Sequence, residues 1–130
     1  MSNNSVYLDA NVLIEIILER GHQAAAKAVL EGARHDLRIS ALTAHLVVHF
    51  GVTRVDLPII RKFLGDYQIL PLEQADFEWA FVNARNQDFE DALQLAVAIR
   101  NGCDRFITFD QTLYRAYKQL PSIKLELIGE

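Results

Sequence analysis

The chain has a single cysteine, Cys103, among its 130 residues. One cysteine excludes an internal disulfide and a thiolate-rich metal site, and it fits a reducing compartment. Glycine and proline are also scarce, at six and three residues, and they are scattered rather than gathered into a linker. With 51% hydrophobic residues and no repeat, residues 1–130 are expected to fold as one domain with its own core.

Long apolar runs and basic runs are missing as well. Charged residues interrupt every apolar segment before it could span a bilayer, so we expect no membrane segment. The start, MSNNSVYLD, lacks the charged and apolar regions of a secretory signal, which predicts a cytoplasmic protein. The net charge of −4, with Arg61-Lys62 as the only adjacent basic pair, argues against a nucleic-acid coat protein. It leaves open an enzyme that keeps its acidic groups in one pocket.

Short apolar runs alternate with stretches that have helical periodicity. Strands are expected at residues 6–9, 37–40, 67–70, 105–108 and 123–128. Helices are expected at residues 11–20, 23–34, 41–52, 57–64, 74–85, 89–101 and 111–119. This alternation predicts a three-layer α/β/α fold around a mainly parallel central sheet of about five strands. Such sheets bind ligands beyond the carboxyl ends of their strands, near the switch point in strand order.

Aspartates stand at that predicted edge. Asp9 and Asp110 each close an apolar run, and Asp88 and Asp91 lie in the first turn of the helix that reads DFEDALQLAVA. Each aspartate alone is more simply explained as a helix cap, because its oxygen atoms accept from free N–H groups at a helix start. The set points further. Asp91 lies one turn into an apolar helix that Asp88 already caps, and aspartate is rarely buried without a partner or a metal.

Carboxylates that gather at strand ends repel one another unless a cation lies among them. With Thr108 nearby and no cluster of cysteine or histidine, the ligands would be oxygen atoms, which suit Mg²⁺ or Mn²⁺. Such ions serve phosphoryl transfer and phosphodiester hydrolysis, because they generate hydroxide, orient the phosphate and offset charge on the leaving oxygen. The sequence contains no Ser-His-Asp signature, P-loop or glycine-rich dinucleotide fingerprint.

The segments DANVLIEI, DFEDALQLAVA and ITFD, in this order over nearly the whole chain, resemble the PIN-domain family, the fold of many VapC-type toxin ribonucleases. The DFEDALQLA segment is the most specific of the three. The resemblance implies an endoribonuclease that acts on RNA, with a small antitoxin protein as partner and a homodimer as its assembly. It also implies site roles for six residues: Asp9, Asp91 and Asp110 as metal ligands, Asp88 as an auxiliary carboxylate, and Asn11 and Thr108 as neighbours of the site.

One departure from the family concerns the helix after the second strand, which generally carries an acidic residue early on. No carboxylate occurs from Ala41 to Val55, and the expected position falls on His45 or Leu46. His45 has either a functional role, as a substitute metal ligand or as the partner of a bound water, or it is an ordinary partly buried histidine. The sequence leaves both interpretations open. Phe109 stands where many relatives carry a basic or polar residue, so one substrate contact is expected to be missing.

Three functions follow from these patterns. The first is a Mg²⁺- or Mn²⁺-dependent endoribonuclease in which a metal-bound water attacks the phosphodiester. The second is a PIN-like module that binds nucleic acid or a protein without cleavage, which the missing carboxylate motivates. The third is a phosphoacceptor receiver or an aspartate-nucleophile phosphatase. It ranks last, because a phosphatase would need an aspartate where this chain has Asn11, and a receiver's paired carboxylate and late lysine are not evident.

Overall fold

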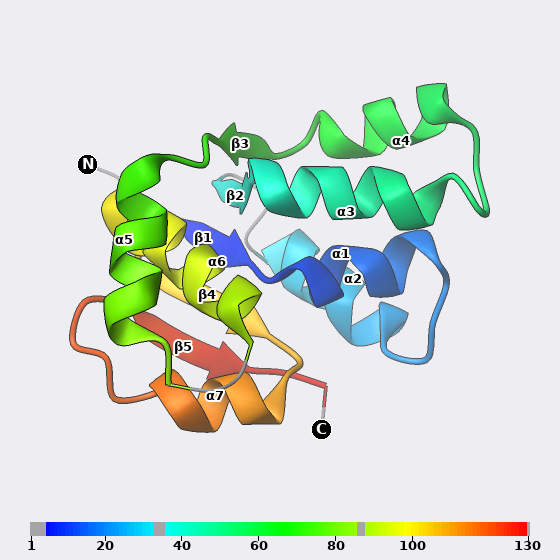
Figure 1. Cartoon of the computed structure of the whole chain (residues 1–130). Helices are drawn as coiled ribbons and strands as arrows, with labels where there is room; N and C mark the ends of the chain where they lie inside the picture. The colour runs from blue at the N-terminus through cyan, green and yellow to red at the C-terminus, as the bar shows by residue number, and fades with distance from the viewer. Residues whose placement is uncertain (1–4, 33–35, 86–87, 130) are drawn as a thin grey trace.

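The computed structural model describes residues 5–32, 36–85 and 88–129 (Figure 1). Within these ranges five strands form one sheet in the order β3-β2-β1-β4-β5, and every neighbouring pair is parallel. The strands are β1 (Val6–Leu8), β2 (Leu37–Ser40), β3 (Gln68–Leu70), β4 (Arg105–Thr108) and β5 (Lys124–Leu127). The helices are α1 (Ala10–Ile17), α2 (Gln23–Gly32), α3 (Ala41–Gly51), α4 (Leu57–Leu64), α5 (Gln74–Asn83), α6 (Phe89–Arg100) and α7 (Gln111–Tyr117). The predicted α/β fold around a parallel five-stranded sheet is confirmed.

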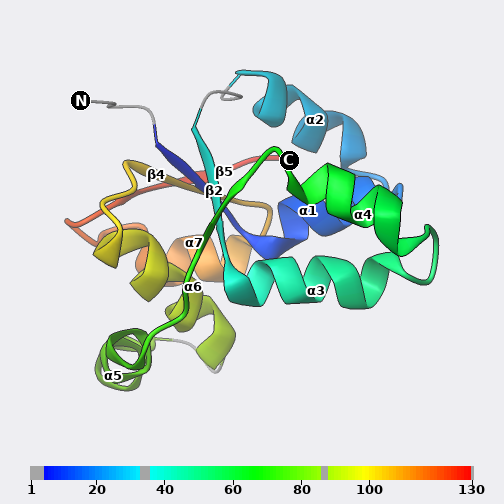
Figure 2. The same ribbon diagram turned by 90° about the horizontal axis from the view of Figure 1, so that it is seen from above.

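The central strand β1 divides the core into two parts, because successive side chains of a strand point to opposite faces. Val6 and Leu8 pack with residues of α1, α2, α3 and α4 on one face. Tyr7 packs with residues of α6 and α7 on the other, and its ring stacks on that of Phe106 with centroids 5.1 Å apart. Figures 1 and 2 show this division, with α1 to α4 on one side of the strands and α5 to α7 on the other.

The switch point lies between β1 and β4. From β1 the chain proceeds outward through β2 to the edge strand β3, and then returns across β1 to form β4 and β5. The carboxyl ends of β1 and β4 therefore lie side by side with connections that leave in opposite directions, which is where such sheets form ligand sites. The N–H of Asp9 donates to the carbonyl of Ile107 at 2.9 Å and joins the two ends.

The ends of several elements differ from the expectation by one to three residues, the usual uncertainty of helix boundaries. The larger difference is in α1, which stops at Ile17 although its pattern continues to Arg20. Glu19 adopts a left-handed φ of 52°, which a continuing helix cannot accommodate. The predicted helix at 23–34 ends at Gly32, and residues 33–34 lie outside the described ranges. No helix within those ranges is long and apolar enough to cross a membrane.

Candidate active site

Asp9 lies at the junction of β1 and α1 and is only 3% exposed. It occupies the N-cap position of α1, but its side chain makes no capping hydrogen bond. Instead, Oδ1 accepts from Nε2 of Gln94 at 3.0 Å, and Oδ2 accepts from Oγ1 of Thr108 at 2.7 Å. The capping interpretation is therefore wrong for Asp9, because its carboxylate is held by α6 and β4 rather than by its own helix.

The environment of Asp9 is unfavourable for a negative charge. Burial raises the pKa of its carboxyl from the ordinary value of 3.8 to about 6. Hydrogen bonds from Thr108 and Gln94 lower this pKa, and the charge of Asp110 raises it. In the part of the chain that the structure describes, no ion pair within 4.0 Å includes Asp9 or Asp110. A buried carboxylate with neutral donors, beside a second carboxylate, is typical of a functional site.

Gln94 is the residue that the sequence analysis missed. It is 1% exposed and lies on α6, one turn after Asp91. While its Nε2 donates to Asp9, its Oε1 accepts from the hydroxyl of Tyr7 at 3.3 Å, the N–H of Ala10 at 3.3 Å and the hydroxyl of Thr43 at 3.1 Å. The signal was present in the sequence. A glutamine that is buried inside an apolar helix needs hydrogen-bond partners, and in the structure they come from Tyr7, Asp9, Ala10 and Thr43.

Thr108 and Asp110 connect the end of β4 to this network. The Thr108 hydroxyl is buried, donates to Asp9 and accepts from the N–H of Asp110 at 2.9 Å. Oδ1 of Asp110 accepts from the N–H of Leu113 at 3.1 Å, so this aspartate caps α7 as the local pattern allows. Thr108 thus lies between the two carboxylates, beside the site where the sequence placed it.

The two aspartates of α6 differ in exposure. Asp88 is exposed, and its Oδ1 accepts from the N–H of Glu90 at 3.0 Å and of Asp91 at 3.4 Å, so it caps α6. Asp91 is buried, with 6% exposed, in the first turn of the helix. Both the cap at Asp88 and the burial of Asp91 agree with the sequence analysis.

His45 lies on the exposed face of α3, where its ring is 6.2 Å from that of His49. The interpretation as a partly buried packing histidine is therefore wrong, and its role as a metal ligand stays a prediction. Leu46 packs against the core instead. The α3 residue that reaches the Asp9 network is Thr43, whose N–H is capped by Ser40 at 3.0 Å. Residues two positions apart on a helix are separated by about 200° around its axis, so Thr43 and His45 lie on opposite faces of α3.

The fit of a metal ion is partial. Carboxylate oxygens are the ligands that Mg²⁺ and Mn²⁺ prefer, so the chemistry of the donors fits. Across residues 5–32, 36–85 and 88–129, however, no three side chains of histidine, cysteine, aspartate or glutamate group closely enough to hold an ion. Asp110 is near enough for its charge to raise the pKa of Asp9, and Asp91 does not complete a trio with them. The set of three ligands stays a prediction.

A cavity of about 280 Å³ opens beside Asp110. It is lined by Asn11, Glu15, Arg20, Phe109 and Asp110. Asn11 was expected near the site, whereas Glu15 and Arg20 were not singled out from the sequence. The cavity combines a second acidic side chain, a guanidinium and an aromatic ring at the same edge as Asp9.

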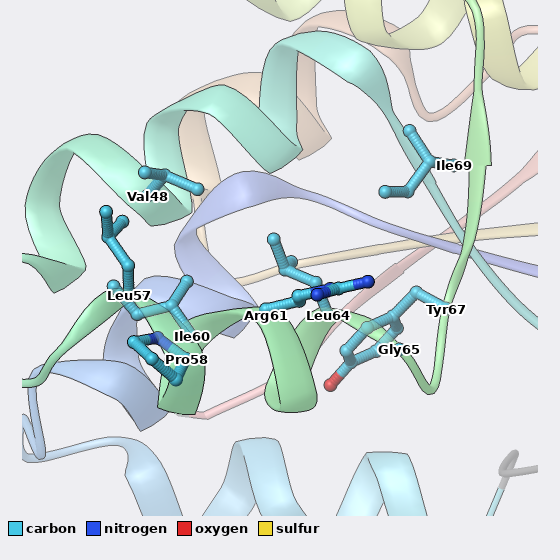
Figure 3. Close-up of a pocket in the computed structure, with 9 residues that line it drawn as sticks. All are labelled: Val48, Leu57, Pro58, Ile60, Arg61, Leu64, Gly65, Tyr67 and Ile69. Atoms are coloured by element: carbon cyan, nitrogen blue, oxygen red, sulfur yellow. The ribbon is translucent and has the colours of Figure 1, made fainter.

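A second hollow, of about 810 Å³, is an apolar groove between α3, α4 and β3 (Figure 3). Figure 3 shows Val48, Leu57 and Ile60 grouped at one end, and Tyr67 and Ile69 at the other. The lining residues are Val48, Leu57, Pro58, Ile60, Arg61, Leu64, Gly65, Tyr67 and Ile69. None of the predicted site residues is among them, and Arg61 is the only charged one.

Comparisons with known proteins agree with the fold and the sequence motifs. A family model described as PIN domain matches residues 6–119. Ribonuclease VapC1 of Aquifex aeolicus (strain VF5) is 26% identical over 126 residues, which cover 88% of this chain and 87% of that protein. A toxin-antitoxin complex from Klebsiella pneumoniae has a similar fold, with a TM-score of 0.75 at 22% identity over 92% of this chain and 95% of that one. VapBC2 from Rickettsia felis, bound to a DNA fragment from its promoter, has a TM-score of 0.67 at 17% identity, over 94% and 97%.

Proposed function

Because the chain belongs to the PIN-domain family, we propose that it is a divalent-metal-dependent endoribonuclease and the toxin of a toxin–antitoxin pair. The observation that carries the proposal is Asp9, a buried carboxylate with only neutral hydrogen-bond donors and a second carboxylate nearby. This arrangement does not stabilise the fold, but it suits a site that takes up a cation. The name of the VapC1 relative supports RNA as the substrate.

In this proposal Asp9, Asp91 and Asp110 hold Mg²⁺ or Mn²⁺. When bound, the ion supplies a water-derived nucleophile and offsets charge on the phosphodiester. The protein's own part is to position the ligands. Gln94 and Thr108 each donate to one oxygen of Asp9 and so fix the plane of its carboxylate. Asp88 caps α6 and holds the turn that carries Asp91.

The experiment is cleavage of single-stranded RNA by the wild type and by Asp9→Asn, with and without Mn²⁺. The substitution keeps the shape of the side chain and removes its charge, so we expect a loss of about 100-fold or more. Asp56→Asn is the matched control, because Asp56 is exposed and its side chain makes no capping bond. Equal activity of the wild type and Asp9→Asn, or cleavage that needs no divalent ion, would reject the mechanism.

A second candidate is a PIN-like module that binds nucleic acid or protein without cleavage. Its support is α3, where Thr43 reaches the Asp9 network and no carboxylate does. Calorimetric titration with Mn²⁺ separates the two. A module without activity should bind little Mn²⁺ at millimolar concentration. Clear Mn²⁺ binding that Asp91→Asn abolishes would count against this second candidate.

The antitoxin belongs to the same proposal, and the groove of Figure 3 is its expected binding surface. Leu57 and Ile69 in the groove are 59% and 46% exposed, a large apolar area to leave in water. Because Arg61 is positively charged, we expect an acidic residue in the antitoxin segment that binds in the groove. Co-expression with the antitoxin of such a pair, sought as a small protein encoded beside this gene, should give a complex that Leu57→Asp disrupts. A complex unaffected by this substitution would place the antitoxin elsewhere.

The homodimer is a separate part of the proposal. Phe81 and Val82 on α5 are strongly exposed, and the Phe81 ring packs on that of Phe89 with centroids 4.7 Å apart. We expect a second copy to cover this apolar surface. Light scattering should give a dimer mass that Val82→Asp halves while leaving antitoxin binding intact, the reverse of the effect of Leu57→Asp. A monomeric wild type would contradict the dimer.

A further inference from the structure

Glu15 lies on α1, one turn after Asn11, and it is partly buried at the cavity beside Asp110. Its Oε2 is buried and accepts no hydrogen bond. Among the residues that the structure describes, it is the only buried side-chain nitrogen or oxygen atom without a hydrogen-bond partner. An unpaired buried acceptor is costly, and more so when it belongs to a charged group. Glu15 lines the cavity, so a rotation of its side chain would bring this closed-off oxygen to a ligand that donates to it and remove the cost of the missing hydrogen bond.

The opposite wall of the cavity is aromatic and held in place. Phe109 packs against the ring of His22, with centroids 5.1 Å apart and planes inclined by 34°. Gly129, at a φ of 79°, passes so close that a Cβ there would overlap the Phe109 ring. The ring therefore has little room to move. Phe109, which from sequence marks the loss of a polar substrate contact, supplies an apolar wall to the cavity.

An unpaired carboxylate oxygen beside an aromatic ring suits a nucleobase. Single-stranded RNA is recognised by bases that stack on aromatic rings or guanidinium groups and form hydrogen bonds along their Watson–Crick edges. Of the four RNA bases, guanine alone presents two adjacent N–H donors on that edge, at N1 and at the 2-amino group. Two such donors match the two oxygens of one carboxylate.

We propose that this cavity binds a guanine base of the RNA substrate, with Glu15 accepting from N1 and the 2-amino group and Phe109 packing against the base. The substrate part rests on the proposed ribonuclease function. Asp110 lines the cavity and is joined through Thr108 to Asp9, so a base bound here sets the adjoining phosphodiester at the carboxylates. The enzyme would then prefer to cut beside a guanine.

A cation is the rival ligand for Glu15, since Asp110 lines the same cavity. Arg20 favours the base, because it lines the same cavity and its positive charge repels a cation. A guanidinium instead suits the phosphate or the face of a nucleotide.

The test is an NMR titration of the full-length wild type with guanosine, inosine or adenosine in the presence of EDTA. Nucleosides lack a phosphate, and EDTA removes divalent ions, so only base recognition is measured. We expect guanosine to bind about tenfold or more tightly than adenosine, with inosine, which lacks the 2-amino group, in between. Glu15→Gln should bring guanosine to the level of adenosine. Glu78→Gln, an exposed glutamate on α5, is the control and should change nothing.

The outcomes separate this proposal from the ribonuclease function. Equal binding of guanosine and adenosine, binding of neither, or preference that survives Glu15→Gln overturns the guanine pocket. In a separate titration without EDTA, signals of Glu15 and its neighbours that respond to Mn²⁺ and not to guanosine also overturn it and assign a cation site. A protein that selects guanosine but cuts no RNA keeps the pocket and refutes the nuclease. Asp9-dependent cleavage without guanosine selection does the reverse.

Discussion

The acidic side chains at the amino edge of the sheet, where its strands begin, and at the carboxyl edge, where its strands end, differ in burial and in the charges around them. At the amino edge, Asp104 accepts from the N–H and the hydroxyl of Ser5 at 3.1 and 2.9 Å. Asp36 there forms a two-pronged ion pair with Arg38 at 2.9 and 3.2 Å. At the carboxyl edge, Asp9 also accepts only from neutral donors, as Asp104 does, but it is more deeply buried, and the nearby charge of Asp110 opposes its own.

This difference separates carboxylates that stabilise the fold from the one that we propose binds a cation. A carboxylate that only stabilises the fold is paired with a cation or shares donors that offset its loss of water. The amino edge follows that rule. Asp9 departs from it, because its pKa is raised where that of a structural carboxylate would be lowered. The carboxyl edge thus keeps an unfavourable charge in the absence of a ligand, and substitutions at the two edges should differ in sign and size.

The largest effect is expected from Gln94→Ala, which breaks the carboxyl edge. It removes the partner of Asp9 and leaves the Tyr7 hydroxyl and the Ala10 N–H without the acceptor they share. Lost hydrogen bonds and a cavity together should lower the free energy of unfolding by about 3–5 kcal/mol. Urea unfolding measures this, with Gln111→Ala, an exposed glutamine, as control. Similar losses in both variants would contradict the role of Gln94.

Asp9→Asn should stabilise the metal-free protein, in contrast to any loss of a carboxylate at the amino edge. The folded pKa of about 6 lies above the ordinary value of 3.8, so the native state binds more protons between these pH values. The stabilisation that the protonated Asp9 carboxyl contributes is fully present below the unfolded pKa of 3.8 and is lost as the pH rises through the folded pKa of about 6. Relative to the wild type, Asp9→Asn should gain about 3 kcal/mol between pH 4 and pH 8. A difference that does not vary with pH would contradict the raised pKa.

Arg38→Leu, at the amino edge, should have the smallest effect. It removes an ion pair whose side chains are each 20% exposed, and such pairs contribute about 1 kcal/mol. Thermal unfolding should show a small loss, and RNA cleavage should stay at the wild-type rate. A loss of cleavage comparable to that of Asp9→Asn would mean that the two edges are not functionally distinct.

Local patterns account for most of the fold. The predicted bounds of β2 and β4 agree with the structure, because a short apolar run between a charged segment and a polar break has few alternatives. The cap at Asp88 was equally local, since its partners are two and three residues away. The early end of α1 was not predictable in this way. It follows from the left-handed turn at Glu19, which is not a residue type that signals such a turn.

The site was only partly predictable because its contacts are not local. The partners of Asp9 are 85 and 99 residues away, at Gln94 and Thr108, so neither could be read from the pattern around it. From sequence the expected position on α3 fell on His45 or Leu46, whereas Thr43 is the residue that reaches Gln94, the partner of Asp9. Two of the four aspartates, Asp88 and Asp110, cap helices, and one of them also adjoins the site.

The sequence by itself determined the order of helices and strands, the parallel sheet and the edge at which the aspartates stand. It could do so because periodicity is local and because crossovers between parallel strands allow few arrangements. Only the tertiary structure decided that Asp9 is held by neutral donors, and that Glu15 keeps an unpaired oxygen at a cavity beside Asp110. The physical reason is that burial and pairing are properties of the packed chain, set by segments that meet only after folding.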